Sequence, residues 1–303
     1  MINKFSIGDI FWLDIESPTK DEIEHLSDEL DIPEIIKNEL LPKTLRSKVQ
    51  TYEDGFYLVL HFPYPGSSRD KSQEIEVDFL VHKKYLITIH YSHINTSREF
   101  YDFLQQSLKE KSKDSPRDGG ALFYEFLKIF YRRINNRLLD FNKNLLKIEK
   151  EIFDEKEDYA VKSISSSKRT LLDFKQALRF HKDILLSLED SSEGIFGEDF
   201  KNKINLLVGE YNKIDNMLAG HKEILEDLHM TNDSLLTTKT NATIKRLTIL
   251  SFIMLPLTLI SGIFGMTTRA PFIESNQEFI LIIGAMCSIA IIMFLYFKIK
   301  KWL

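Results

Sequence analysis

The sequence predicts an α+β membrane protein. A cytoplasmic α/β/α sheet domain and a bundle of long helices precede a continuous stalk helix, which leads into a two-helix transmembrane hairpin. Three observations predict this fold class: short β-rich segments before residue 95, helical periodicity after it, and a loss of charged residues near residue 247. The expected divisions are a sheet domain at 1–95, a helical region at 96–198, a stalk at 199–246, a first span at 247–266, an outer loop at 267–278, a second span at 279–297 and a basic tail at 298–303.

Composition separates a charged body from an apolar end. The 303-residue chain has a formal net charge of −5, and its Lys, Glu and Asp residues are concentrated before about Asn241. A single cysteine, Cys287, excludes a disulfide or a paired-cysteine metal site within one chain. The first residues lack the pattern of a secretory signal, so we expect the body to stay in the cytoplasm.

Two apolar runs predict the membrane spans. Leu247 to Met266 and Phe279 to Phe297 contain no Asp, Glu, Lys, Arg or His, and each is close to the roughly 20 residues that a helix needs to cross a bilayer. Basic residues flank the pair on its outer ends, namely Lys245, Arg246, Lys298, Lys300 and Lys301. We therefore expect an inner-membrane protein with both termini in the cytoplasm. Hydropathy alone leaves open a plain two-helix anchor.

One face of the first span favours a pore or a helix interface. Seven residues follow one another at spacings of three or four: Asn241, Ile244, Leu247, Ser251, Leu255, Thr258 and Gly262. Polar groups at membrane depth are tolerated where they meet neighbouring helices or water. A single helix cannot enclose a channel, so several chains would have to assemble.

Glycines near the outer end of this span allow two interpretations. Gly262 and Gly265 leave backbone accessible, and Pro256 removes one backbone hydrogen bond in mid-span. Backbone carbonyls could replace water around a cation, or the glycines could permit close helix packing. Both can hold together.

Five segments of the body read as strands because they are rich in β-branched or aromatic residues between turn formers. They are Ile10 to Ile15, Ser47 to Tyr52, Phe56 to His61, Ile75 to Val81 and Tyr85 to His90. Ser17 and Pro18 predict a helix start, and Pro33 a second boundary. From about Ser97 we expect two long antiparallel helices and a third that begins near Asp199 and continues into the membrane.

Carboxylates gather where the two long helices are expected to turn. They are Glu149, Glu151, Asp154, Glu155, Glu157 and Asp158. Oxygen ligands at this density suit divalent ions, although a solvated helix tip is the favoured interpretation. The histidines lack the spacing of a zinc site, and no phosphate-binding glycine loop or nucleophile motif appears. We therefore predict that the protein is not an enzyme and has neither a prosthetic group nor a nucleic-acid partner.

The stretch MLPLTLISGIFGM, followed by a short loop, a second span and the ending YFKIKKWL, resembles the CorA family of divalent-cation channels. The body supports this resemblance, because FWLDIESPTKDEIEHLSDELDIP, RSKVQTYEDGFYLVLHFPY and KKYLITIHY follow the order of elements in that family's cytoplasmic domain. The resemblance implies a funnel-shaped homopentamer whose first span lines the pore. It assigns that role to Asn241, Ile244, Leu247, Leu255, Thr258 and Gly262.

The chain departs from the family at the outer mouth. The family's Gly-Met-Asn signature is replaced by Gly265, Met266 and Thr267, and a threonine hydroxyl is a shorter and weaker acceptor than an amide oxygen. A zinc-transporting branch also departs from the signature, but it keeps the Asn. The outer loop adds Arg269, Glu274 and Glu278, and a ring of arginines would oppose cations that carboxylates attract.

The resemblance implies passive transport of a divalent cation, magnesium first, through a pore gated by the cytoplasmic domain. Magnesium or another divalent ion would be both the transported species and a regulatory ligand, although we assign no regulatory ligands. Two alternatives stay open: a zinc, cobalt or nickel transporter of the same fold, and a poorly conducting, membrane-anchored regulatory protein on the same scaffold.

Overall fold

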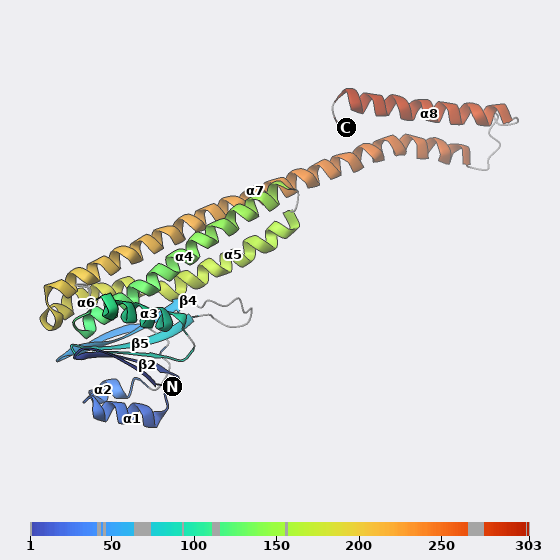
Figure 1. Cartoon of the computed structure of the whole chain (residues 1–303). Helices are drawn as coiled ribbons and strands as arrows, with labels where there is room; N and C mark the ends of the chain where they lie inside the picture. Colours follow the sequence, from blue (N-terminus) through green and yellow to red (C-terminus); the bar gives the residue numbers. More distant parts are fainter. Residues whose placement is uncertain are drawn as a thin grey trace. The chain divides into compact units, whose positions relative to one another are not determined.

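The computed structural model describes residues 2–40, 44, 47–63, 74–92, 94–110, 116–154, 157–265, 276–300 and 302, without the side chains of 95, 107–110, 157 and 276–279. The chain divides into two compact units, Met1–Leu228 and His229–Leu303. The predicted sheet domain and helical region therefore fall into one unit. This follows from packing, because the helices after residue 95 cover one face of the sheet (Figure 1).

A six-stranded mixed sheet lies at the centre of the first unit. Its strands are β1 (Ile2–Ile7), β2 (Ile10–Glu16), β3 (Lys48–Tyr52), β4 (Gly55–Pro63), β5 (Glu74–His82) and β6 (Tyr85–His90). The spatial order is β1-β2-β6-β5-β4-β3, in which only β2 and β6 are parallel. All five predicted strands are present.

Strand β1 was not predicted. It is an edge strand, mostly exposed, and its residues Asn3, Lys4 and Ser6 give it little β-rich character. The hairpin to β2 turns at Gly8, whose φ of +60° favours glycine. Pairing with β2, from Ile2 opposite Ile15 to Ile7 opposite Ile10, makes this segment a strand.

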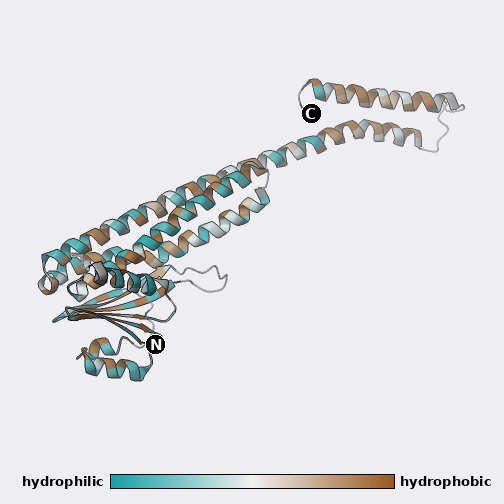
Figure 2. Cartoon of the chain, in the orientation of Figure 1, coloured by the Kyte–Doolittle hydropathy of each residue, from teal (hydrophilic) through white to brown (hydrophobic). Residues whose placement is uncertain are grey.

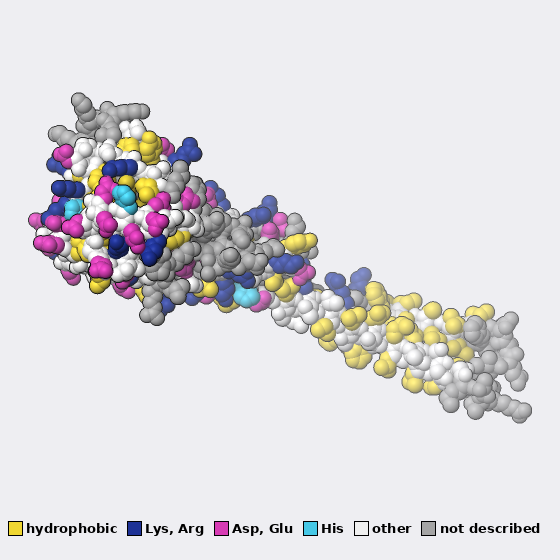
Figure 3. All heavy atoms as spheres, turned by 90° about the horizontal axis from the view of Figure 1, so that it is seen from below, with side chains coloured by type: hydrophobic (Ala, Val, Ile, Leu, Met, Phe, Trp, Pro, Cys, Tyr) yellow, Lys and Arg dark blue, Asp and Glu magenta, His cyan; other side chains and the backbone are white. Residues whose placement is uncertain are grey.

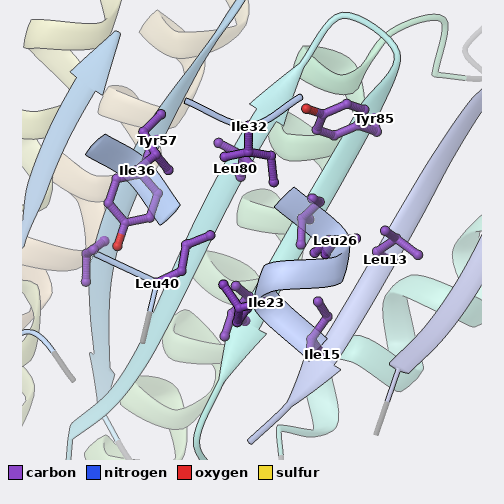
Figure 4. Packing of buried hydrophobic residues seen from close by; sticks show 13 residues of the cluster. Leu13, Ile15, Ile23, Leu26, Ile32, Ile36, Leu40, Tyr57, Leu80 and Tyr85 are labelled. Carbon is purple, nitrogen blue, oxygen red and sulfur yellow. The ribbon is translucent and has the colours of Figure 1, made fainter. Parts of the chain in front are cut away.

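Helices α1 (Lys20–Glu29) and α2 (Glu34–Lys37) cover one face of the sheet. Their apolar side meets strand residues such as Ile15 and Leu80 in a buried cluster (Figure 4). The predicted helix start at Pro18 is wrong by two residues. Ser17 has a φ of +49°, and the cap is Thr19, which forms a capping box with Glu22.

Helices α3 (Asn95–Glu110) and α4 (Gly119–Phe153) cover the opposite face. The layer between them and the sheet is aromatic: Phe126 packs 5.8 Å from Trp12, 5.7 Å from Phe79 and 4.8 Å from Phe100, measured between ring centres. Trp12 also donates a 3.0 Å hydrogen bond from Nε1 to Thr88 Oγ1. The predicted α/β/α layering is thus confirmed.

Helix α5 (Glu157–Leu178) lies beside α4, as expected, but α6 (His181–Phe196) is separate. No Gly or Pro marks this break, so the sequence did not predict it. Tertiary contacts hold it: the buried His181 ring accepts a hydrogen bond at Nδ1 from Tyr131 (3.0 Å) and donates from Nε2 to the His61 carbonyl (2.8 Å). Burial lowers the pKa of His181 to about 4, which fits a neutral ring.

Helix α7 (Glu198–Gly265) runs unbroken for 68 residues, through Pro256, and confirms the predicted continuity of stalk and first span. Helix α8 (Asn276–Ile299) contains the whole second span. The description of α7 stops at Gly265, one residue before the predicted end of the first span, and α8 begins three residues before the predicted start of the second. The end of α7 and nearly all of α8 are apolar (Figure 2).

In the described part of the chain, two helices are long and apolar enough to cross a membrane, and the most apolar stretch of each is only 6% buried. A soluble core helix would bury most of such a stretch. In the space-filling view, hydrophobic side chains cover the surface of this end of the chain (Figure 3). Such an exposed apolar surface is typical of a segment that contacts lipid or other copies of the chain.

Candidate pore-lining site

The seven residues of the predicted stripe are all exposed on α7. At about 100° per residue, Ile244 through Gly262 fall within an arc of roughly 80°, and Asn241 lies about 40° beyond its edge. Ile244, Leu247 and Leu255 expose 55%, 59% and 68% of their surface. Within the described part of the chain, these side chains of the stripe are more than half exposed.

The opposite face of the same span is the covered one. Ile249 is 3% exposed, and the partly buried positions continue from it at helical spacing, namely Ile253, Pro256, Leu257 and Ile260. Their centre lies about 180° from the centre of the stripe. The sequence did not single out this face, because a uniformly apolar helix has similar hydropathy on every side.

Helix α8 supplies the matching surface. Its buried or partly buried positions also recur at helical spacing and are Ile282, Met286, Ile289, Ala290, Met293 and Phe297. Phe297, near the end of the second span, is 9% exposed, and Ile249 lies near the start of the first. In an antiparallel hairpin these two positions fall at the same end. The hairpin therefore packs through one side of α7 and leaves the stripe outward.

Two hydroxyls of the stripe bind their own helix. Ser251 donates to the Leu247 carbonyl (3.0 Å), and Thr258 donates to the Met254 carbonyl (2.8 Å). This satisfies the hydroxyl proton without help from water. The lone pairs of each oxygen stay available as acceptors, which is the polarity that a hydrated cation requires.

The two glycines have open space around them. A Cβ added to Gly262 or Gly265 would meet no atom within 4 Å. Among the described residues, close packing within one chain therefore does not account for glycine at these positions, and packing between copies is compatible with it. Pro256 lies on the α8-facing side, away from the stripe.

The altered filter lies largely outside the described residues. Gly265 ends α7, whereas Met266, Thr267, Arg269 and Glu274 fall in the interval that is not described. Glu278 belongs to α8, without a described side chain. The predictions made for these six residues stay predictions.

Other candidate metal ligands do not converge in the described part of the chain. Within it, no group of three or more His, Cys, Asp or Glu side chains could hold a metal ion. At the α4–α5 turn, Glu149, Asp154 and Asp158 are exposed, and Glu151 accepts a 3.0 Å hydrogen bond from Ser163. Glu155 and the side chain of Glu157 lie outside the description. The described carboxylates fit the solvated tip.

Comparison with known proteins decides the family. A family model described as a CorA-like Mg2+ transporter protein matches residues 8–300. The chain belongs to this family. The resemblance drawn from the sequence is therefore confirmed over nearly the whole chain, and family membership places the protein among membrane transporters of divalent cations rather than enzymes.

Individual relatives are distant but match end to end. The magnesium transport protein CorA of Campylobacter jejuni is 23% identical over 309 residues, covering 97% of this chain and 91% of the relative. The cobalt/magnesium transport protein CorA of Thermotoga maritima is 22% identical over 298 residues, covering 96% and 83%.

Solved structures share the fold. The CorA magnesium transporter of Methanocaldococcus jannaschii has a TM-score of 0.82 at 21% identity, covering 99% of this chain and 93% of that one. The full-length CmaX protein has a TM-score of 0.74 at 15% identity, covering 97% and 89%. The predicted combination of sheet domain, long helices and terminal hairpin is thus a known fold.

Proposed function

We propose that this CorA-family protein conducts Mg2+ passively across the inner membrane through a homopentameric pore, with both termini in the cytoplasm. The observation that carries the proposal is the division of α7 into two faces. One face packs against α8, while the opposite face is exposed and bears Asn241, Ser251, Thr258 and Gly262. These polar residues alternate with Ile244, Leu247 and Leu255, and polar groups at membrane depth are tolerated where they meet water or neighbouring helices.

In this assembly the stripe of each copy faces a common axis. Ions shed part of their water between Gly262 and Thr267, pass the Thr258 hydroxyls and reach an apolar constriction at Leu247 and Ile244. Such constrictions gate by dewetting. A divalent cation that crosses the full membrane potential gains about 5 kcal/mol per 100 mV, so uptake needs no other energy source.

Gating is proposed to arise in the cytoplasmic domain. Helix α7 runs from Glu198 to Gly265 without a break, so movement at its cytoplasmic end can reach Ile244 and Leu247. Divalent ions bound to that domain would then regulate the channel as well as pass through it.

Two alternatives are favoured by specific observations. The relative from Thermotoga maritima is named a cobalt/magnesium transport protein, which supports a transition metal such as cobalt, nickel or zinc as the cargo. Thr267 and Arg269, in the predicted outer loop, favour instead a poorly conducting protein that acts as a membrane-anchored regulator.

Flux into liposomes containing the purified full-length protein separates these functions. We expect Mg2+ uptake that depends on an inside-negative potential and exceeds uptake of Zn2+ and Co2+. Faster Co2+ or Zn2+ uptake would reassign the cargo, and no flux of any of the three would favour the regulator.

The outer mouth offers a second test. Thr267→Asn restores the amide of the family signature, and Arg269→Gln removes the positive ring. Each change is expected to increase Mg2+ flux several-fold. Lys298→Gln, which removes a charge from the other end of the hairpin, is the matched control for a general change in surface potential. Unchanged flux in both variants would argue against a filter at 265–267.

A further inference from the structure

An acidic side chain is buried in the apolar core of the first unit. Asp78, on β5, is 0% exposed. It stands opposite Val59 of β4 and Ile89 of β6 in the sheet register, and these neighbours are 0% and 1% exposed. Both neighbours belong to the buried cluster that α1 and α2 cover (Figure 4). An ionised carboxylate is costly in such surroundings unless hydrogen-bond donors surround it.

The carboxyl group of Asp78 is only half satisfied. The Tyr57 hydroxyl donates to its Oδ2 at 2.9 Å. Its Oδ1 is buried, and within the described part of the chain no hydrogen-bond partner reaches that atom. An ionised Asp78 would leave this charged oxygen without a donor, which protein interiors avoid. A proton on Oδ1 would instead turn the atom from an acceptor into a donor.

Glu76 is the neighbour that can accept from such a donor. It lies two residues before Asp78 on β5, so both side chains point to the same face of the sheet. Burial first, and then the charge of Glu76, raise the pKa of Asp78 well above its ordinary value. A hydrogen bond between the two carboxyl groups acts in the same direction. Such a bond requires a proton on one of them, because two adjacent carboxylates repel each other.

Other titratable groups face this pair from β3, β4 and the segments that follow α2 and β6. They are Lys48, Tyr57, His61, Glu39 and Tyr91. The Lys48 amine, which also pairs with Glu39, favours the ionised form of Asp78, as does the hydrogen bond from Tyr57. Burial outweighs both, because the pKa of Asp78 stays well above its ordinary value.

Glu76 also fixes a residue that is distant in the sequence. Its Oε1 accepts the Thr44 N–H at 2.7 Å. The Thr44 carbonyl accepts from His61 Nε2 at 3.0 Å, and Ser47 Oγ lies 3.0 Å from His61 Nδ1. Movement of the Glu76 carboxylate away from Asp78 would therefore break a contact that holds Thr44 against the sheet.

We propose that Asp78 holds a proton at neutral pH and donates it in a hydrogen bond to Glu76, and that this carboxyl pair is an alkaline-sensitive latch on Thr44. At alkaline pH hydroxide removes the proton and forms water, which leaves two negative charges side by side. Glu76 is 9% exposed and Asp78 is 0% exposed, so Glu76 is the one that turns toward solvent and releases the Thr44 amide. Neither residue belongs to the proposed pore, so the latch does not depend on ion conduction.

Infrared spectroscopy of the full-length protein in an ester-free detergent tests for the proton. At pH 7, the spectrum of the wild type minus that of Asp78→Asn should contain the carbonyl stretch of a protonated carboxyl group. This band should disappear in alkaline buffer. A wild-type protein without the band at pH 7 would overturn the proposal.

Asp54→Asn is the matched control for this difference spectrum. Asp54 lies in the hairpin between β3 and β4, and a hydrogen bond from Lys83 at 2.9 Å lowers the pKa of its exposed carboxyl group. Its difference spectrum at pH 7 should contain carboxylate bands and no protonated carboxyl band. The same protonated band in both difference spectra would contradict its assignment to Asp78.

Two substitutions should move the alkaline transition of the band in opposite directions. Glu76→Gln removes the neighbouring negative charge, so Asp78 should ionise at a lower pH than in the wild type. Tyr57→Phe removes the donor to Oδ2 that favours the charged form, so ionisation should occur at a higher pH. A merely destabilised protein would not give shifts of opposite sign. Coinciding transitions in all three proteins would show that the proton is not shared by this pair.

Hydrogen exchange at the Thr44 amide tests the latch itself. Wild type and Asp78→Asn should exchange this amide at the same rate below the alkaline transition. Above it, the wild type should exchange roughly tenfold faster, because a hydrogen bond to a charged group is lost. Comparing the two proteins at equal pH removes the effect of base on exchange chemistry. Equal rates on both sides of the transition would rule out the latch, whatever the infrared band shows about the proton.

Discussion

The two compact units of the chain place similar apolar residues in opposite surroundings. In Met1–Leu228, residues such as Phe79 and Phe126 are fully buried between a sheet and its covering helices. Among the described residues of His229–Leu303, Ile249 and Phe297 are the only buried hydrophobic side chains. The first unit completes a core from its own residues, whereas the second does not.

This difference fits a first unit surrounded by water and a second unit surrounded by lipid. Burial of apolar surface away from water stabilises the first unit. In lipid that driving force between helices is absent, and association depends on van der Waals packing and on polar groups that find partners. Truncating an apolar side chain should therefore lower the stability of the first unit strongly and that of the second unit only slightly. Substitutions on the stripe should instead change ion flux.

The largest expected difference in stability comes from truncating a buried aromatic side chain. Phe126→Ala removes a 0% exposed ring from the aromatic layer and should lower the free energy of unfolding by about 4 kcal/mol. Leu259→Ala, at a 62% exposed position, should cost less than about 1 kcal/mol. Denaturation in detergent followed by far-ultraviolet circular dichroism, which reports the helices of both units, measures both. Equal losses would contradict the comparison.

Low pH should lower the stability of the first unit because His181 is buried in its neutral form. Its pKa of about 4 in the folded protein is below the ordinary value near 6.5, so the unfolded chain binds the extra proton first. Stability is therefore full above about pH 6.5 and falls as the pH drops toward 4, by about 3 kcal/mol. In His181→Gln this part of the pH dependence should disappear, as measured by unfolding midpoints between pH 4.5 and 7. A variant with the wild-type pH profile would rule out this origin.

In the second unit, the position of a residue around α7 should affect ion flux more than the hydropathy of its side chain does. Leu247→Asn places an amide on the stripe and should raise Mg2+ leak into liposomes roughly tenfold by wetting the apolar constriction. Leu250→Asn makes the same change about 60° outside the stripe's arc and should not raise flux. Leak that rises equally in both variants would show that the stripe does not face the pore.

The smallest expected effect on stability comes from a comparison of two threonine substitutions. Thr19 caps α1, and Thr19→Ala should destabilise the first unit by about 1 kcal/mol. Thr258 is bonded to its own helix within the membrane span, so Thr258→Ala should leave the unfolding transition followed by the fluorescence of the buried Trp12 unchanged. A shift of that transition by Thr258→Ala would indicate that the two units unfold together.

Much of the fold could be predicted from sequence because its signals are local. Alternation and β-branched residues marked five strands, and the absence of proline between Asp199 and Pro256 marked one continuous helix. Strand β1 and the break before His181 were not predictable in this way. The first depends on pairing with β2, and the second on hydrogen bonds to Tyr131 and His61.

For the candidate site, the sequence by itself determined the stripe, since spacing of three and four residues defines a face of any helix. It also determined the membrane spans and the family resemblance. Only the tertiary structure decided that α8 covers the opposite face, and only it brought Phe126 of α4 against Trp12 and Phe79 of the sheet. A helix pattern says which residues share a face, but what that face meets depends on segments far away in the chain.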